Sequence, residues 1–188
     1  MTTALLIIDV QRAILTGLAH ADRQPSIDAR LDAVSARLGR MKRAAEASGV
    51  PVILVQHDGD TGHRLEYGTT DWLFRDEITP RHDTVVVHKR SCDSFHDTDL
   101  SERLAELGIN HLVIGGCMTQ FCVDTTTRRA TSMGFDVTLL SDGHTTADFG
   151  SLTVEQIVDH HNCLLSGFNA GSKAVRVVPS EAACFLTT

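Results

Sequence analysis

The chain has 188 residues, of which 42% are hydrophobic and 22% are charged, so it can bury the core of one ordinary domain. Its 17 Lys and Arg residues against 24 Asp and Glu residues give a net charge of −7, which argues against a nucleic-acid-binding surface. We therefore expect a single domain over residues 1–188 that does not bind nucleic acid.

No stretch of sequence approaches the roughly 18 consecutive apolar residues that a membrane span requires. The first residues, MTTALLIIDVQ, lack the basic start of a secretory signal. Five cysteines form an odd set without a C-x-x-C pair, which argues against a disulfide framework or a zinc ribbon. These features predict a cytoplasmic protein without membrane association.

Short apolar runs alternate with amphipathic segments along the chain. The run ALLII before Asp9 is typical of a strand buried on both faces of a parallel sheet. Residues 26–48 place apolar side chains at three- and four-residue steps, with Ser26 as a candidate N-cap and Gly49 after the C-terminus. The predicted strands are 4–8, 51–56, 84–88, 111–114, 136–140 and 173–178, and the predicted helices are 26–48, 98–107, 121–133 and 152–168. This order predicts a three-layer α/β/α, Rossmann-like fold with a mainly parallel sheet of about six strands.

Three chemically reactive side chains follow predicted strands, and the carboxyl ends of parallel strands are where such sheets bind ligands. Cys122 falls in the first turn of a predicted helix, where unpaired N–H groups favour a thiolate. Asp9 can accept the thiol proton, and Lys89 can hold both anions by charge, as nucleophilic acyl transfer requires. The same residue types also fit a buried structural cysteine, a capping aspartate and a solvated lysine.

Three segments resemble the isochorismatase-like cysteine hydrolases, the superfamily of nicotinamidase, N-carbamoylsarcosine amidase and isochorismatase. They are ALLIIDVQ (4–11), VVVHKRSCDSFHDTDL (85–100) and LVIGGCMTQFCVDTTTRRATSMGFDVTLLSDGHTT (112–146). The second is similar to the family's K-x-x-x-S-x-F block at Lys89, Ser94 and Phe95, one residue longer than in some members. The third is similar to G-x-x-T-x-x-C-V-x-x-T between Gly116 and Thr126. Together these segments extend the resemblance over nearly the whole chain.

The resemblance implies roles for residues at the matched positions. It implies a catalytic triad of Asp9, Lys89 and Cys122, a cis peptide between Cys117 and Met118, and an oxyanion hole made by the backbone N–H groups of Met118 and Cys122. It also implies a small-molecule substrate and assembly as a homodimer or homotetramer. No cofactor is expected.

The candidate substrate contacts are Gln11, Trp72 and Phe95. Trp72 lies in a long polar loop where an aromatic wall would help to bind a ligand, although it could equally anchor the loop. Phe95 could instead belong to the core, and Gln11 could be a turn residue. We predict no metal, because the stretch QHDGDTGH lacks the Asp-x-His pattern of nicotinamidases. The sequence alone does not decide whether the side chains of His57, Asp58 and His63 contact substrate or a metal.

Further polar residues follow the fifth predicted strand and occupy the last predicted helix. Asp142 and His144 could form a His–Asp pair near the edge of the sheet. His160 and His161 lack metal-ligand spacing, which favours a surface or subunit-interface role.

The presence of Cys122 favours one chemistry within the superfamily. We predict hydrolysis of a C–N bond in a small amide, carbamoyl or ureido compound through a thioester on Cys122. Two alternatives stay open. The first is an isochorismatase-type vinyl-ether hydrolase that uses Asp9 without Cys122, and the second is a non-enzymatic binding member of the fold.

Overall fold

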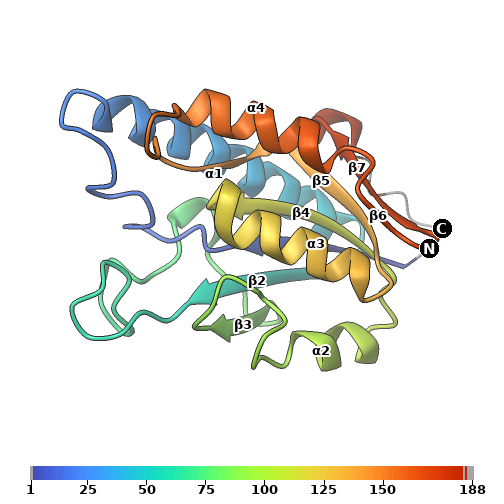
Figure 1. Ribbon diagram of the computed structural model, residues 1–188. Coiled ribbons are helices and arrows are strands. Elements are labelled where there is room, and N and C mark those ends of the chain that lie inside the picture. The colour runs from blue at the N-terminus through green and yellow to red at the C-terminus, as the bar shows by residue number, and fades with distance from the viewer. Residues whose placement is uncertain (1, 184, 186–188) are drawn as a thin grey trace.

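A seven-stranded sheet forms the centre of the protein in a computed structural model, which describes residues 2–183 and 185 (Figure 1). The strand order is β3-β2-β1-β4-β5-β7-β6, and every neighbouring pair is parallel except β6 with β7. The strands are β1 (Thr3–Ile8), β2 (Val52–His57), β3 (Val85–Lys89), β4 (His111–Cys117), β5 (Asp136–Thr145), β6 (Asn169–Ala170) and β7 (Lys173–Val178). The predicted mainly parallel α/β fold is confirmed.

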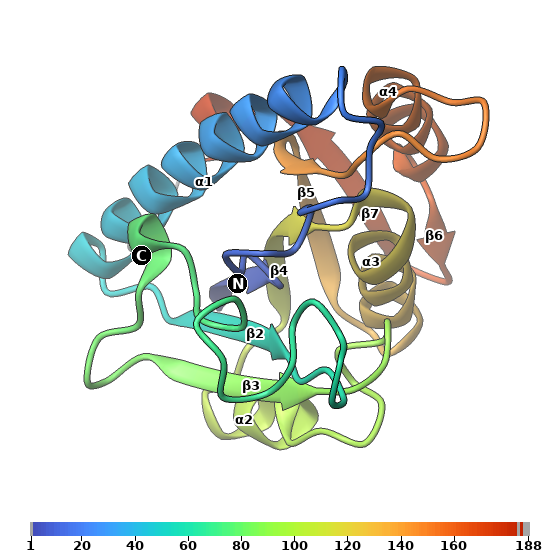
Figure 2. The ribbon, with the colours of Figure 1, turned by 90° about the vertical axis from the view of Figure 1, so that its left-hand side faces the viewer.

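Helices cover both faces of the sheet, which gives the three layers that the sequence predicts (Figure 2). The helices are α1 (Gln24–Ala47), α2 (Leu100–Glu106), α3 (Asp124–Ser132) and α4 (Val154–Leu165), with short turns η1 (Asp76–Ile78), η2 (Thr119–Val123) and η3 (Ser180–Ala182). Side chains of α1 and η1 pack on one face of the sheet, and those of α2, α3 and the end of α4 pack on the other. Among the described residues, no helix combines the length and the apolar character needed to cross a bilayer.

Strand β1 lies at the middle of the sheet and shows why its sequence is continuously apolar. Ala4, Leu6 and Ile8 join the core on one face, whereas Leu5 and Ile7 join the core on the other. All five side chains are fully buried. A strand covered by helices on both faces requires this unbroken apolar run.

All six predicted strands and four predicted helices are present, with three differences in detail. Strand β5 continues to Thr145, since it pairs again with β4 beyond an irregularity between Ile114 and Gly116. The seventh strand, β6, has two residues, too few to show a sequence pattern. The predicted helix 121–133 is divided into the π-helical turn η2 and the α-helix α3.

The prediction for the end of α1 is confirmed, and that for its start is wrong. Gly49 adopts a left-handed conformation (φ 68°) just after the helix. Ser26 is not the N-cap, because the helix begins at Gln24 with Pro25 in its first turn. Proline suits that turn because it has no N–H to leave unpaired.

The order of the strands places a binding crevice beside β1. The chain moves outward from β1 to β2 and β3, then returns to the other side of β1 to form β4. In open parallel sheets, ligands bind beyond the carboxyl ends of the strands at such a reversal. The segments that follow β1 and β4 therefore form the expected walls of a site.

Candidate active site

Asp9 follows the last residue of β1 and turns the chain out of the sheet. Its backbone is left-handed (φ 51°), a conformation that aspartate tolerates better than most residues. Its N–H donates to the Val55 carbonyl at 2.9 Å, and its carbonyl accepts from the Gln11 N–H at 2.9 Å. The carboxylate is thereby held, almost fully buried, at the crevice.

Lys89 ends β3 and connects the other two candidate catalytic residues. Its ammonium donates to Asp9 Oδ2 at 2.7 Å, to the Ser91 carbonyl at 2.8 Å and to Cys122 Sγ at 3.2 Å. These contacts use all three donors of the ammonium, so its orientation is fixed. Burial opposes the charge, but the Asp9 and Cys122 anions outweigh burial and raise the pKa of Lys89.

Cys122 lies in η2, the π-helical turn that joins β4 to α3. The N–H of Val123 reaches the Met118 carbonyl at 3.2 Å, five residues back, which defines this wide turn. The peptide bond between Cys117 and Met118 is cis. Gly116 allows β4 to approach β1 here, since a Cβ atom at its position (φ 132°) would lie 2.1 Å from the Ile8 carbonyl oxygen.

The predicted triad residues therefore meet as one buried cluster, which contains one cation and two groups that can become anions. Burial, followed by the Cys122 charge, raises the pKa of Asp9 well above its ordinary value. A second uncompensated negative charge is costly in such a site. One proton shared between Asp9 and Cys122 leaves the cluster neutral, so Asp9 can hold the proton while Cys122 is a thiolate paired with Lys89.

A second cysteine borders the candidate nucleophile. A hydrogen bond with Cys122 lowers the pKa of Cys92 to about 6, while the same hydrogen bond, together with burial, raises the pKa of Cys122. The two thiols thus compete for one negative charge. The contact of the Lys89 ammonium with Cys122 Sγ favours Cys122 as the site of that charge.

A cavity of about 440 Å³ opens on the cluster and reaches Asp9, Cys92 and Cys122. Most of its remaining wall is apolar, formed by Ile14, Leu18, Leu65, Met118, Phe121, Ala147 and Phe149. The cavity volume lies within the range of small-molecule sites in proteins. A small ligand can therefore reach the thiol and the carboxylate together.

The three predicted substrate contacts do not line this cavity. Phe95 is 8% exposed and packs in the core against Phe135, with ring centroids 6.0 Å apart. The Trp72 indole donates to Asp58 at 2.8 Å and stacks on the His88 ring. Both aromatic residues therefore follow the structural alternatives that the sequence leaves open.

The fully buried side chain of Gln11 joins two neighbouring segments instead of facing the cavity. Its amide nitrogen donates to the carbonyls of His57 and Trp72 at 3.0 and 2.7 Å, and its amide oxygen accepts from the His57 N–H at 3.0 Å. The side chain thus closes the base of the loop that follows β2. These contacts favour the structural alternative that the sequence leaves open for Gln11.

Replacing Gln11 with Leu is expected to destabilise the protein by about 2–4 kcal/mol, because the buried N–H and carbonyl of His57 lose this side-chain partner, whereas the Trp72 carbonyl keeps its hydrogen bond from Gln56. Chemical denaturation of the two proteins measures the difference. A Gln11→Leu protein with unchanged stability would contradict this structural role.

The polar residues at the end of β2 and in the following loop divide between two places. Asp58 accepts from Trp72 and lies 3.1 Å from His88 Nδ1, whereas His57 and His63 line the cavity. Burial lowers the pKa of His57. Within residues 2–183 and 185, no three His, Cys, Asp or Glu side chains gather as a metal site would require.

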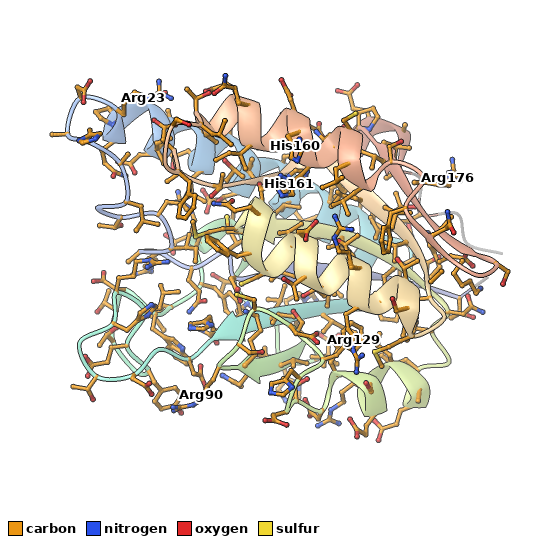
Figure 3. The ribbon with its side chains drawn as sticks, viewed as in Figure 1. Arg23, Arg90, Arg129, His160, His161 and Arg176 are labelled. Carbon is orange, nitrogen blue, oxygen red and sulfur yellow. The ribbon has the colours of Figure 1, made fainter. Side chains whose placement is uncertain are left out.

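The predicted pairing of Asp142 with His144 is wrong. His144 is almost fully buried and bridges Thr119 Oγ1 at 2.9 Å and Asn162 Oδ1 at 3.0 Å, thereby linking η2 to α4. Asp142 instead pairs with Arg37 at 2.9 Å. On α4, His160 and His161 lie side by side with ring centroids 5.2 Å apart, and neither lines the cavity (Figure 3).

Acid is expected to weaken the fold through His144. Burial lowers its pKa to about 4, whereas the unfolded chain takes up the proton near pH 6.5. Protonation therefore favours unfolding as the pH falls from about 6.5 to about 4, a loss on the order of 3 kcal/mol. Denaturation of the wild type and His144→Gln across this range is the test, and equal pH dependence in both proteins would exclude His144 as the cause.

Sequence reasoning missed the cavity position of Arg64 and gave the Cys92–Cys122 contact no functional weight. Arg64 lies in the long polar loop after β2 and lines the cavity. The sequence offered one signal for it, namely that long loops in compact domains often carry functional residues. Cys92 lies three residues after Lys89, so proximity to the site was foreseeable, but a thiol–thiol contact depends on how the two segments pack. Neither contact has a sequence pattern of its own.

Comparisons with known proteins identify the family of the chain. Residues 3–165 match the Isochorismatase domain family. Streptothricin hydrolase of Streptomyces noursei is 33% identical over 145 residues, which cover 77% of this chain and 55% of that protein. A ureidoacrylate amidohydrolase of Methylobacterium radiotolerans is 27% identical over 156 residues, covering 68% of this chain and 60% of its own length.

A solved structure gives the same result for the whole fold. An isochorismatase from Pseudomonas putida KT2440 superposes with a TM-score of 0.81 at 29% identity, over 97% of this chain and 90% of that one. The family model covers most of the chain, including the segments that carry the buried Asp–Lys–Cys cluster. Since the family model matches most of the chain and the fold superposes on a solved member, the chain belongs to the isochorismatase family of hydrolases.

Proposed function

We propose that this protein is a cysteine amidohydrolase that cleaves the C–N bond of a small amide, carbamoyl or ureido compound. The observation that carries the proposal is the position of the Lys89 ammonium, 2.7 Å from Asp9 and 3.2 Å from Cys122 at an open cavity. The similarity to a streptothricin hydrolase and to a ureidoacrylate amidohydrolase supports this class of substrate.

In the first half of the reaction, Cys122 attacks and the amine departs. Asp9 accepts the thiol proton, and Oδ1 is the available atom, since it is buried and has no hydrogen-bond partner among the described residues. The thiolate forms a bond to the carbonyl carbon, and the backbone N–H groups of Met118 and Cys122 stabilise the oxyanion. The C–N bond then breaks, and Asp9 returns the proton to the leaving nitrogen.

In the second half, water releases the acyl group. Asp9, again a carboxylate, takes a proton from water as the water oxygen bonds to the thioester carbon. The C–S bond breaks, the carboxylic or carbamic acid departs, and Cys122 leaves as a thiolate stabilised by Lys89. The proton that Asp9 took from water is then shared between Asp9 and Cys122, which restores the neutral cluster.

A substrate panel distinguishes this chemistry from the two alternatives. Primary amides, N-carbamoyl compounds and ureas are assayed for ammonia, and a vinyl ether of the isochorismate type is assayed for pyruvate, with wild type and Cys122→Ala. Ammonia release that depends on Cys122 is the expected result. Pyruvate release that persists in Cys122→Ala would indicate an ether hydrolase, and ligand binding without any turnover would indicate a binding protein.

A further inference from the structure

Arg64 lines the same cavity as Cys122 and is held there by the protein. Its Nε donates to the Ile14 carbonyl at 3.0 Å, and Nη2 lies 3.8 Å from the sulfur of Met118. Both contacted residues are also part of the cavity wall. The guanidinium is therefore positioned in the ligand space rather than free in solvent.

Over the part of the chain that the structure describes, the Arg64 guanidinium has more N–H donors than protein acceptors and no carboxylate partner. Of its five N–H groups, one donates to the Ile14 carbonyl and one meets only the weakly accepting Met118 sulfur, so three have no protein partner among the described residues. Within residues 2–183 and 185, no carboxylate lies within 4.0 Å of Arg64. Burial lowers the pKa of Arg64, which reflects the cost of a half-buried charge.

Among the described residues, both carboxylates on the cavity wall already have a cationic partner. Asp9 pairs with Lys89, and Asp148 pairs with Arg23 at 2.8 Å. Arg23 lies just before the first residue of α1 (Figure 3). Within the described ranges, Arg64 is thus an arginine without a carboxylate partner on a mostly apolar wall. Guanidinium binds carboxylates through two parallel N–H···O bonds, and the partial exclusion of water strengthens such a pair.

We propose that Arg64 selects substrates that carry a carboxylate at the end remote from the bond that Cys122 attacks. The apolar walls would contact the carbon chain between the two ends, and Arg64 would bind the carboxylate. This inference rests on the proposed amidohydrolase function and narrows it to amides or ureido compounds of carboxylic acids.

Binding tests the carboxylate site apart from the chemistry. In the Cys122→Ala protein, calorimetry compares malonamate, succinamate and glutaramate with the corresponding neutral diamides. We expect at least one of the acids to bind about 10- to 100-fold more tightly than its diamide. Arg64→Gln should abolish that preference and Arg64→Lys should keep part of it, whereas Arg90→Gln, which removes an exposed arginine paired with Asp60, should leave it intact (Figure 3).

Turnover of the same compounds separates the two proposals. Faster ammonia release from the acids than from the diamides, in a manner that requires Arg64, supports both. A carboxylate preference in binding without ammonia release would keep the role of Arg64 and reject hydrolysis of these amides. Equal binding of acids and diamides by the wild-type site, or a preference that survives in a folded Arg64→Gln protein, would overturn the inference even if amides are hydrolysed.

Discussion

Cys122→Ala is expected to lower turnover by at least about 10⁴-fold, because loss of a nucleophile removes the covalent route altogether. The protein should still fold. Without the Cys122 sulfur, the buried Lys89 ammonium keeps its 2.7 Å contact with Asp9, so the cluster retains one cation and one anion. We therefore expect ammonia release to vanish while the thermal unfolding curve stays close to that of the wild type.

Cys92 provides the matched control for this experiment. Cys92 is exposed, borders the same cavity and has a pKa lowered to about 6 by its hydrogen bond with Cys122, so it can react with alkylating reagents in its own right. Labelling of a cysteine therefore does not identify the nucleophile. Cys92→Ser should keep turnover within about tenfold of the wild type, because the contact between Lys89 and Cys122 remains.

Mass spectrometry of the protein during turnover adds a direct measurement. The acyl group should appear on the peptide that contains Cys122 and be absent from the peptide that contains Cys92. If Cys122→Ala were active and Cys92→Ser inactive, the nucleophile would be Cys92 and the proposed role of Lys89 would have to be revised. Activity in both single variants would show that neither cysteine alone is required, which would contradict the proposed role of Cys122.

The sequence predicts the sheet well because burial on two faces requires unbroken apolar runs. Strand β1 is the clearest case, since every residue from Ala4 to Ile8 is buried. The extension of β5 to Thr145 was not predictable in the same way, because its second part contains Ser, Asp, Gly, His and Thr. That part is held by pairing with β4 beyond an irregularity, which no local pattern records.

In the candidate site, too, positions set by strand order could be predicted, whereas contacts between distant segments could not. Asp9, Lys89 and Cys122 each follow or end a strand, so topology alone brings them to one edge of the sheet. Gln11 and His144 illustrate the limit. Gln11 lies two residues after Asp9, and its sequence position is compatible with a contact to substrate or to backbone. Its contacts with the His57 and Trp72 carbonyls depend on how the loop after β2 packs, which the sequence does not show. His144 is likewise defined by Asn162, a partner on a distant helix.

The roles of Asp9 and Lys89 can be separated by two variants with opposite effects on the thiolate. In Asp9→Asn, the competing carboxylate is gone, and Cys122 becomes the sole remaining partner that can neutralise Lys89 within the cluster. The thiolate should persist at lower pH. In Lys89→Met, the ammonium 3.2 Å from Cys122 Sγ is gone, so the thiolate loses the positive charge that stabilises it.

Asp9→Asn is expected to reduce turnover by about 10³-fold, since an amide cannot carry the proton from thiol to leaving group. Alkylation of Cys122, measured in a Cys92→Ser background, should at the same time be as fast as in the parent protein or faster at pH 6. A reactive thiol without turnover is the signature of a lost proton carrier. If alkylation and turnover fell together, Asp9 would instead be required to form the thiolate.

Lys89→Met provides the opposite pattern. Turnover and alkylation should both fall, and the free energy of unfolding should drop by about 3–5 kcal/mol, because the one buried negative charge that Asp9 and Cys122 share is left without its cation. Methionine fills most of the lysine volume, so the loss reports charge rather than a cavity. Because burial already raises the pKa of Asp9, this destabilisation should shrink at acidic pH as Asp9 becomes protonated. A Lys89→Met protein with wild-type alkylation would show that the helix turn around Cys122 stabilises the thiolate without the ammonium.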